Sequence, residues 1–219
     1  MSAYANLLLV MLMAVDLYMV STTRLDACIR ACIIQAMILA TLPFVLGGIH
    51  PDMAFSEQMH FVILAGATQI VKGVVIPWLL FRALRTLSSN REFEPFMSLH
   101  YSQLINCALC GVGFWGAAVL PWPVEHPHPL ALGVALSTLL IGLYMAINRK
   151  KAISQILGYL VIESGLFVAG WALLKQPSSL MELGVLLDLL VAAMVMGILA
   201  TRMDAAADDA RDGNGGGDE

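Results

Sequence analysis

Long apolar segments follow one another along nearly the whole chain, and this pattern limits the possible fold more than any other feature. A helix needs about 20 mostly apolar residues to cross the hydrocarbon core of a bilayer. Of the 219 residues, 59% are apolar and 13% are charged, unlike the composition of a soluble domain. The sequence therefore predicts an all-α, polytopic integral membrane protein with about seven transmembrane helices, over residues 4–22, 28–48, 58–81, 99–121, 129–147, 153–174 and 181–201.

The first apolar segment resembles a retained span rather than a secretory signal. It lacks a basic start, and the run from Tyr4 to Val20 is followed by Thr-Thr-Arg instead of a small-residue cleavage site. The turns between segments carry proline, glycine and charge, as at Gly47-Gly48-Ile49-His50-Pro51-Asp52 and Pro121-Trp122-Pro123. We expect these turns to separate seven membrane helices.

Basic residues occur in alternate turns, which predicts the orientation because lysine and arginine near span ends resist translocation. One set of turns holds ten of the twelve basic residues, and the other set holds only Lys175. The basic set is therefore predicted to be cytoplasmic, with the N-terminus outside and the C-terminus inside. Its members are Arg24, Arg30, Arg82, Arg85, Arg91, Arg149, Lys150, Lys151, Arg202 and Arg211.

The net charge of −4 arises largely from residues 204–219, where acidic residues lie among alanine and glycine. This composition predicts an acidic disordered tail. The basic residues lie in short turns rather than along one surface, which argues against nucleic acid as a partner.

Four ionisable residues lie within predicted spans, where each costs at least about 2.5–3.5 kcal/mol at the bilayer centre. They are Asp16, Lys72, Glu163 and Asp188. From the helical rise, the last three lie roughly 15, 18 and 21 Å from the nearest cytoplasmic basic residues, near the midplane. Asp16 lies roughly 12 Å from Arg24. It is within reach of water or of snorkelling neighbours, which makes it the weakest of the four candidates.

Other polar groups lie at the same depth. Gln69 precedes Lys72 by about one helical turn, and Tyr159 precedes Glu163 by one turn. Pro77 removes a backbone hydrogen bond five residues after Lys72, so we expect an irregular helix beside the lysine. Freed carbonyls and waters at such an irregularity suit an ion path.

Two interpretations of these charges remain open. In the first, the charges titrate during function. In the second, Lys72 forms a static buried pair with Asp188 or Glu163, which only fixes the helix register. One lysine does not neutralise two carboxylates, so either one carboxyl stays protonated or a partner group comes from another subunit.

The remaining candidate sites favour structural explanations. Cys28, Cys32, Cys107 and Cys110 lie in or at the edge of apolar segments, where cysteine behaves as a small hydrophobe. His126 and His128 lie in an outer turn, while His60 and His100 do not form the midplane pair that haem ligation requires. We expect no metal or other cofactor in this chain, and the sequence has no nucleotide-binding, hydrolytic or nucleophile motif that would make it a self-contained enzyme.

Three motifs give the chain a family resemblance. The first is a basic turn running into a span with Gly158 and then Glu163, within Asn148-Arg149-Lys150-Lys151-Ala152-Ile153-Ser154-Gln155-Ile156-Leu157-Gly158-Tyr159-Leu160-Val161-Ile162-Glu163-Ser164-Gly165. The others are Lys72-Gly73-Val74-Val75-Ile76-Pro77, and Glu182-Leu183-Gly184 followed by Asp188. This layout resembles component E of hydrogenase-4-type complexes, a membrane subunit of energy-converting [NiFe] hydrogenases. The last three spans are also similar to the K-type subunit of complex I and the C-type subunit of Mrp antiporters.

The resemblance implies a four-helix region over residues 1–122, a three-helix region of K-type character over 123–203, and the tail. It implies a non-catalytic subunit of a hetero-oligomeric redox complex in a bacterial or archaeal cytoplasmic membrane. Its partners would be antiporter-like membrane subunits and peripheral subunits that carry any [NiFe] centre and iron–sulfur clusters. The implied proton-path residues are Lys72, Glu163, Asp188, Asp16, Gln69 and Tyr159.

Three other roles compete with a proton path. The charges of an assembly scaffold would only lock helices together. A subunit of an Mrp-type cation/proton antiporter would share the basic turn. A free-standing transporter would favour inverted repeats, and we find no convincing repeat in the sequence.

Overall fold

A computed structural model describes residues 3–45, 63, 66, 70–86, 99–120, 129–149, 152–173, 184, 186 and 189–197. The described elements are helices, which confirms the all-α class. They are α1 (Ala3–Ser21), α2 (Leu25–Val45), the π-helical turn η1 (Val71–Val75), α4 (Ile76–Thr86), α5 (Leu99–Val119), α6 (Pro129–Asn148) and α7 (Ala152–Leu173). Residues 189–197, within the predicted seventh span, are also helical.

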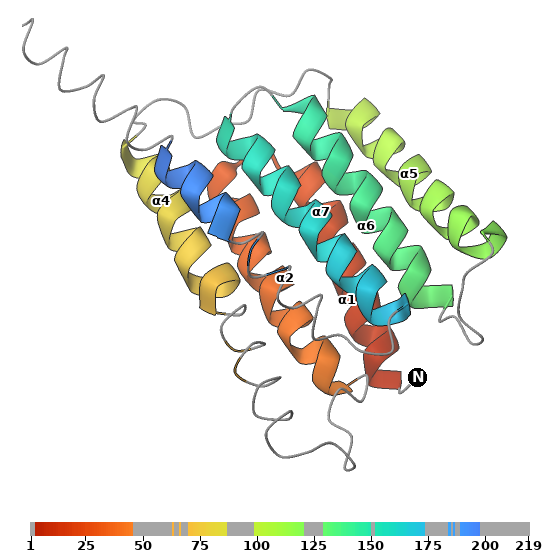
Figure 1. The fold of residues 1–219 in the computed structure, drawn as a ribbon. Helices are drawn as coiled ribbons and strands as arrows, with labels where there is room; N and C mark the ends of the chain where they lie inside the picture. The colour runs from red at the N-terminus through yellow and green to blue at the C-terminus, as the bar shows by residue number, and fades with distance from the viewer. Residues whose placement is uncertain are drawn as a thin grey trace, which may run out of the picture.

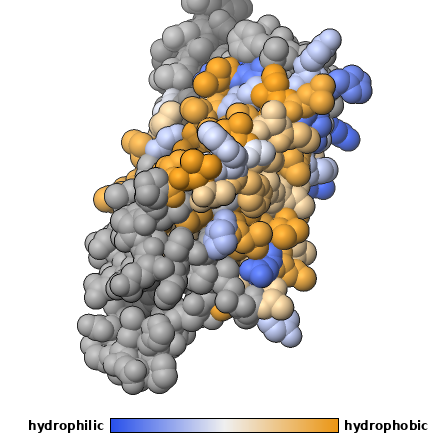
Figure 2. Space-filling view, turned by 90° about the vertical axis from the view of Figure 1, so that its right-hand side faces the viewer, coloured by the Kyte–Doolittle hydropathy of each residue, from blue (hydrophilic) through white to orange (hydrophobic). Residues whose placement is uncertain are grey.

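Five helices are long and apolar enough to cross a membrane: α1, α2, α5, α6 and α7. The sequence predicted a span at each of these places. The predicted third span is described only from residue 70, apart from residues 63 and 66, and its helix continues to Thr86, five residues beyond the predicted end. Many large apolar side chains remain exposed, including Leu104 and Ile147, and Figure 2 shows apolar side chains over much of the described part of one face. The chain is a multi-pass membrane protein.

The helices form a bundle in which α1 lies beside α2, α5 beside α6, and α6 beside α7. Figure 1 shows α6 and α7 packed together, with α5 on the outer side of α6 and with α1 and α2 behind them. The turn between α1 and α2 contains three residues, and so does the turn between α6 and α7. Such short turns place consecutive helices antiparallel to each other. Pro129 begins α6, where its missing N–H leaves no internal helix bond unmade.

Three glycines let α6 and α7 approach at the level of their backbones. A Cβ atom on Gly142 would lie 2.6 Å from the backbone nitrogen of Ile162, and one on Gly158 would lie 2.6 Å from that of Ala146. A Cβ on Gly165 would lie 2.8 Å from the backbone nitrogen of Leu139. No real side chain fits at such distances without moving a helix. We call Gly142, Gly158 and Gly165 the glycine seam, since small residues permit close helix contact in membranes.

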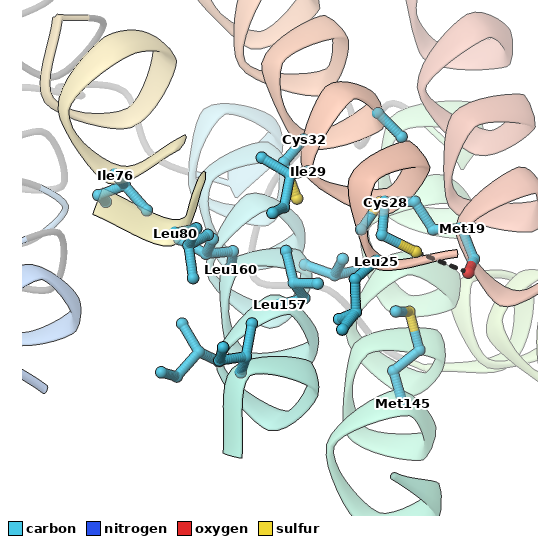
Figure 3. Packing of buried hydrophobic residues seen from close by; sticks show 14 of the residues in the cluster. Met19, Leu25, Cys28, Ile29, Cys32, Ile76, Leu80, Met145, Leu157 and Leu160 are labelled. Atoms are coloured by element: carbon cyan, nitrogen blue, oxygen red, sulfur yellow. Dashed lines mark hydrogen bonds between the residues drawn. The ribbon is translucent and has the colours of Figure 1, made fainter. Parts of the chain in front are cut away.

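A buried apolar cluster joins α2, α4 and α7 beside this seam. Figure 3 shows the side chains converging between these helices, and most of the labelled residues are almost fully buried. The cluster positions η1 against α2 and α7 by packing, because Ile76 follows η1 directly. Its labelled members are Met19, Leu25, Cys28, Ile29, Cys32, Ile76, Leu80, Met145, Leu157 and Leu160.

Candidate functional site

Lys72 and Glu163 form a buried ion pair between η1 and α7. Lys72 Nζ lies 3.3 Å from Glu163 Oε1, and the two side chains are 10% and 5% exposed. The sequence left open whether Lys72 faces Glu163 or Asp188, and the structure brings it to Glu163. Asp188 lies outside the described residues. The contact joins segments that are 91 positions apart in the chain, so it fixes how η1 meets α7.

The helix is irregular where it carries Lys72, as Pro77 led us to expect. The backbone N–H of Ile76 donates to the carbonyl oxygen of Val71, five residues earlier, in a π-helical turn. Pro77 has no N–H to donate to the carbonyl of Gly73, the usual partner four residues back. Single π turns inside α-helices are frequent at functional sites. The widened turn thus places the Lys72 cation in the bundle beside backbone groups whose hydrogen bonds differ from those of a regular α-helix.

Glu163 has unused hydrogen-bonding capacity. Its Oε2 atom is buried and has no hydrogen-bond partner among the residues that the structure describes. The neighbouring hydroxyl of Ser164 does not serve it, because Ser164 Oγ donates 2.8 Å to the carbonyl of Leu160 in its own helix. One carboxyl oxygen therefore faces Lys72 while the other stays available to a further donor.

Of Tyr159 and Gln69, the two predicted polar neighbours of the pair, the structure describes only Tyr159. Tyr159 lies on α7, one turn before Glu163, and is partly exposed. Gln69 lies outside the part of the chain that the structure describes. The structure thus gives the positions of Lys72, Glu163 and Tyr159, and the proton-path roles of all the predicted residues stay predictions.

Asp16 occupies a second polar site, and it is fully buried, although its distance from Arg24 had suggested a place within reach of water at the helix end. Its side chain is 0% exposed. Oδ1 accepts a 2.8 Å hydrogen bond from Gln35 Nε2, and Oδ2 accepts a 2.6 Å bond from Thr138 Oγ1. Asp16, Gln35 and Thr138 come from α1, α2 and α6, so one carboxyl group connects three helices. We call these three residues the Asp16 cluster.

The burial of Asp16 has a local cause at the end of α1. Met19 and Val20, near that end, are 0% and 4% exposed. Arg149, which follows α6, is 5% exposed and donates from its guanidinium to the carbonyl of Met19 at 3.1 Å. Counting residues from Arg24 placed Asp16 close to water, but α1 ends beneath another segment of the chain.

The sequence analysis missed Gln35 and Thr138 as partners of Asp16. Gln35 is a polar amide within the second apolar segment, and amides in such segments commonly bond across helices. That signal was available for Gln35. No comparable signal identified Thr138, because threonine is often satisfied by its own helix, as Thr41 is by the carbonyl of Ile38.

The cysteines are free thiols, and Cys28 and Cys32 are buried in the apolar cluster, as predicted. Cys28 Sγ donates to the carbonyl of Met19, as the dashed line in Figure 3 shows. Within the described ranges, no three His, Cys, Asp or Glu side chains are placed to hold a metal ion. His60, His126 and His128 lie outside those ranges, and His100 is exposed at the start of α5.

Comparisons with known proteins point to one set of relatives. The chain is 29% identical over 191 residues to an uncharacterized protein of Mycobacterium tuberculosis, covering 85% of this chain and 82% of that one. It is 27% identical over 203 residues to hydrogenase-4 component E of Escherichia coli and of Shigella flexneri, covering 89% of this chain and 87% of each relative. No protein-family model matches the chain, and no solved structure matches it. The similarity to hydrogenase-4 component E is distant, although it extends over most of the chain.

Proposed function

We propose that this chain is a membrane subunit of a hydrogenase-4-like, complex I-related redox complex, in which buried charged residues contribute to proton or cation translocation coupled to electron transfer. The similarity to hydrogenase-4 component E along most of the chain supports the assignment to such a complex. The observation that carries the proton role is the Lys72–Glu163 pair, because a buried charge pair in a membrane helix bundle marks a functional path by default.

The proposal includes a topology and a set of partners. Seven spans run from an outer N-terminus to a cytoplasmic C-terminus in a bacterial or archaeal cytoplasmic membrane. Residues 1–122 and 123–203 form the four-helix and three-helix regions, and residues 204–219 form the acidic tail. Antiporter-like membrane subunits adjoin this chain. Peripheral subunits hold any [NiFe] centre and iron–sulfur clusters, so electron transfer takes place outside this subunit.

The ion pair offers a simple proton step. When a proton moves from Lys72 Nζ to Glu163 Oε1, an N–H bond breaks, an O–H bond forms and two opposite charges disappear. A charge that arrives in a neighbouring subunit alters the free energy of this transfer, because opposite or like charges nearby change the protonation of a buried pair. Glu163 Oε2, which faces no donor within the described residues, leaves room for a proton to enter or leave the pair.

A scaffold role is the second candidate, and the same contact favours it. The pair joins η1 to α7, and a static pair that only fixes helix register needs no titration. A subunit of an Mrp-type antiporter is the third, and it differs in its partners. The subunit composition of the purified complex and its coupling of proton movement to electron transfer distinguish these three candidates.

The test is mass spectrometry of the mild-detergent complex purified through this subunit, followed by a coupling assay in membrane vesicles. Wild type, Glu163→Gln and Lys72→Ala are compared with Asp26→Asn, which changes a carboxylate near the start of α2. We expect all four to retain antiporter-like and hydrogenase-like partners. Proton movement per electron transferred falls in the Glu163 and Lys72 variants and is unchanged in the Asp26 control.

Other outcomes identify the alternatives. Loss of partners in the Glu163 and Lys72 variants alone supports the scaffold. Recovery of antiporter subunits without redox subunits supports the Mrp-type complex. A wild-type chain that purifies alone overturns the subunit proposal.

A further inference from the structure

Asn106 on α5 is the starting point for a second path through the bundle. Its side chain is 0% exposed, and neither Nδ2 nor Oδ1 has a hydrogen-bond partner in the described part of the chain. Buried amides are nearly always hydrogen-bonded, and an ordered internal water is the usual partner where protein groups are absent. Asn106 can donate two hydrogen bonds and accept two, so it can hold more than one water molecule.

The residues one turn away on α5 show which way Asn106 faces. Ser102, four residues earlier, accepts a 2.8 Å hydrogen bond from the Tyr144 hydroxyl of α6. Cys110, four residues later, accepts a 3.2 Å bond at its carbonyl from Ser137 Oγ of α6. Residues four apart lie on the same face of a helix. Asn106 therefore lies between these two contacts, on the side of α5 that meets α6 (Figure 1).

This line of polar groups extends in both directions. Toward one end, Asn148 Nδ2 donates 3.1 Å to the Tyr144 hydroxyl, at the last residue of α6. Toward the other, Ser137 is followed by Thr138, which donates to Asp16. The ten residues from Thr138 to Asn148 span roughly 15 Å along α6. Polar groups of α6 thus occur at intervals from the Asp16 cluster to the α6 end that carries the basic turn, with the hydroxyls of Ser137 and Thr138 facing α5 and α1 respectively.

We infer that Asn106 anchors internal water molecules between α5 and α6, and that this hydrated line delivers protons to Asp16 from the end of α6. It is distinct from the Lys72–Glu163 pair in its helices and its carboxyl group. Each water breaks one O–H bond as it passes a proton onward and forms another with the proton that it receives. The net change is one proton from the aqueous side of Asn148 onto an Asp16 carboxylate oxygen.

Infrared spectroscopy of the full-length protein in lipid nanodiscs tests the path directly. The probe is deuterium oxide, and the readout is the carbonyl stretch of the protonated Asp16 carboxyl, identified as the band that Asp16→Asn removes. We expect this band to appear on acidification and to shift as its proton exchanges for deuterium. Asn106→Leu replaces the amide with an apolar group of similar size, and we expect exchange to slow by a factor of about 10 or more.

Two further variants make the test specific. Tyr144→Phe removes the hydroxyl that links Ser102 to Asn148, and we expect it to slow exchange even if Asn106→Leu does not fold. Ser154→Ala is the control, because Ser154, like Asn106, has a buried polar side chain without a partner in the described ranges but lies on α7. We expect Ser154→Ala and Glu163→Gln to exchange as the wild type does.

The inference is overturned if Asn106→Leu and Tyr144→Phe exchange at the wild-type rate, or if Ser154→Ala slows exchange equally. It is also overturned if no exchanging Asp16 band appears, because a carboxyl on a proton path must be reached by protons. None of these results depends on partners or on electron transfer. Failure of this inference is therefore distinguishable from failure of the proposed function.

Discussion

Glu163 and Asp16 both lie in the interior of the bundle, but the groups that hold them differ. Glu163 faces a cation, Lys72, with one oxygen and has no described partner for the other. Asp16 faces two neutral donors, one for each oxygen. The position of Glu163 depends on one long side chain from an irregular helix, whereas Asp16 is fixed by short contacts from two regular helices. The first carboxyl is paired with an opposite charge, and the second has both oxygens fixed by neutral hydrogen-bond donors.

Removing Lys72, the cation beside Glu163, should produce the largest loss of stability, which tests the charged site of this comparison. We expect Lys72→Met to lower the free energy of unfolding by about 3–5 kcal/mol, because it leaves Glu163 buried without its partner. The measurement is the fraction of folded protein during SDS titration in bicelles. Arg82→Met is the control, since Arg82 is an exposed cation that lies over the Trp78 ring on the same helix, α4. Equal losses in the two variants would contradict the role given to the ion pair.

A change in the Asp16 cluster, whose hydrogen-bond donors are neutral, should lower the free energy of unfolding by less. Thr138→Val keeps the shape of the side chain but removes one of the two donors to Asp16. We expect a loss of about 1–3 kcal/mol in the same titration, the usual effect of leaving a buried acceptor unsatisfied. Thr41→Val on α2 is the matched control, because the Thr41 hydroxyl bonds to the carbonyl of Ile38 in its own helix. A loss at Thr138 as large as that at Lys72 would erase the difference between the two sites.

Replacing both members of the ion pair should produce the smallest change in stability. We expect the free energy of unfolding of the Lys72→Met, Glu163→Leu double variant to lie within about 1 kcal/mol of the wild-type value, because apolar residues often replace a buried ion pair at little cost. The same titration measures stability, and vesicle coupling measures function. A stable but uncoupled double variant sharpens the distinction between a functional pair and a scaffold. Persistent instability would show that the pair is needed for packing.

The sequence predicted the helices well because the membrane requirement is strong and local. The apolar segments predicted at 4–22, 99–121 and 129–147 correspond to α1, α5 and α6 within two residues at each end. The irregular turn beside Lys72 was also predictable, since the effect of Pro77 follows from its own covalent structure. Both features are set by the local sequence and do not depend on how the helices pack together.

The partners of the buried groups were harder to predict, because they depend on how helices are arranged around one another. Depth along a helix placed both Glu163 and Asp188 near the level of Lys72, and only packing brings Lys72 to Glu163. The same reason explains the misjudged Asp16. Its distance from Arg24 was counted along one helix, while its burial comes from α2, α6 and the segment at Arg149.

The glycine seam has a consequence for how the two carboxyl sites influence each other. Thr138 lies on one side of this seam and Glu163 on the other, on helices whose backbones are already in contact. Close-packed interiors compress very little. A force that pushed α6 toward α7 would therefore not move the two helices closer together. A change of charge at one site would instead act on the other through the electric field across a fixed separation, with no movement of the helices.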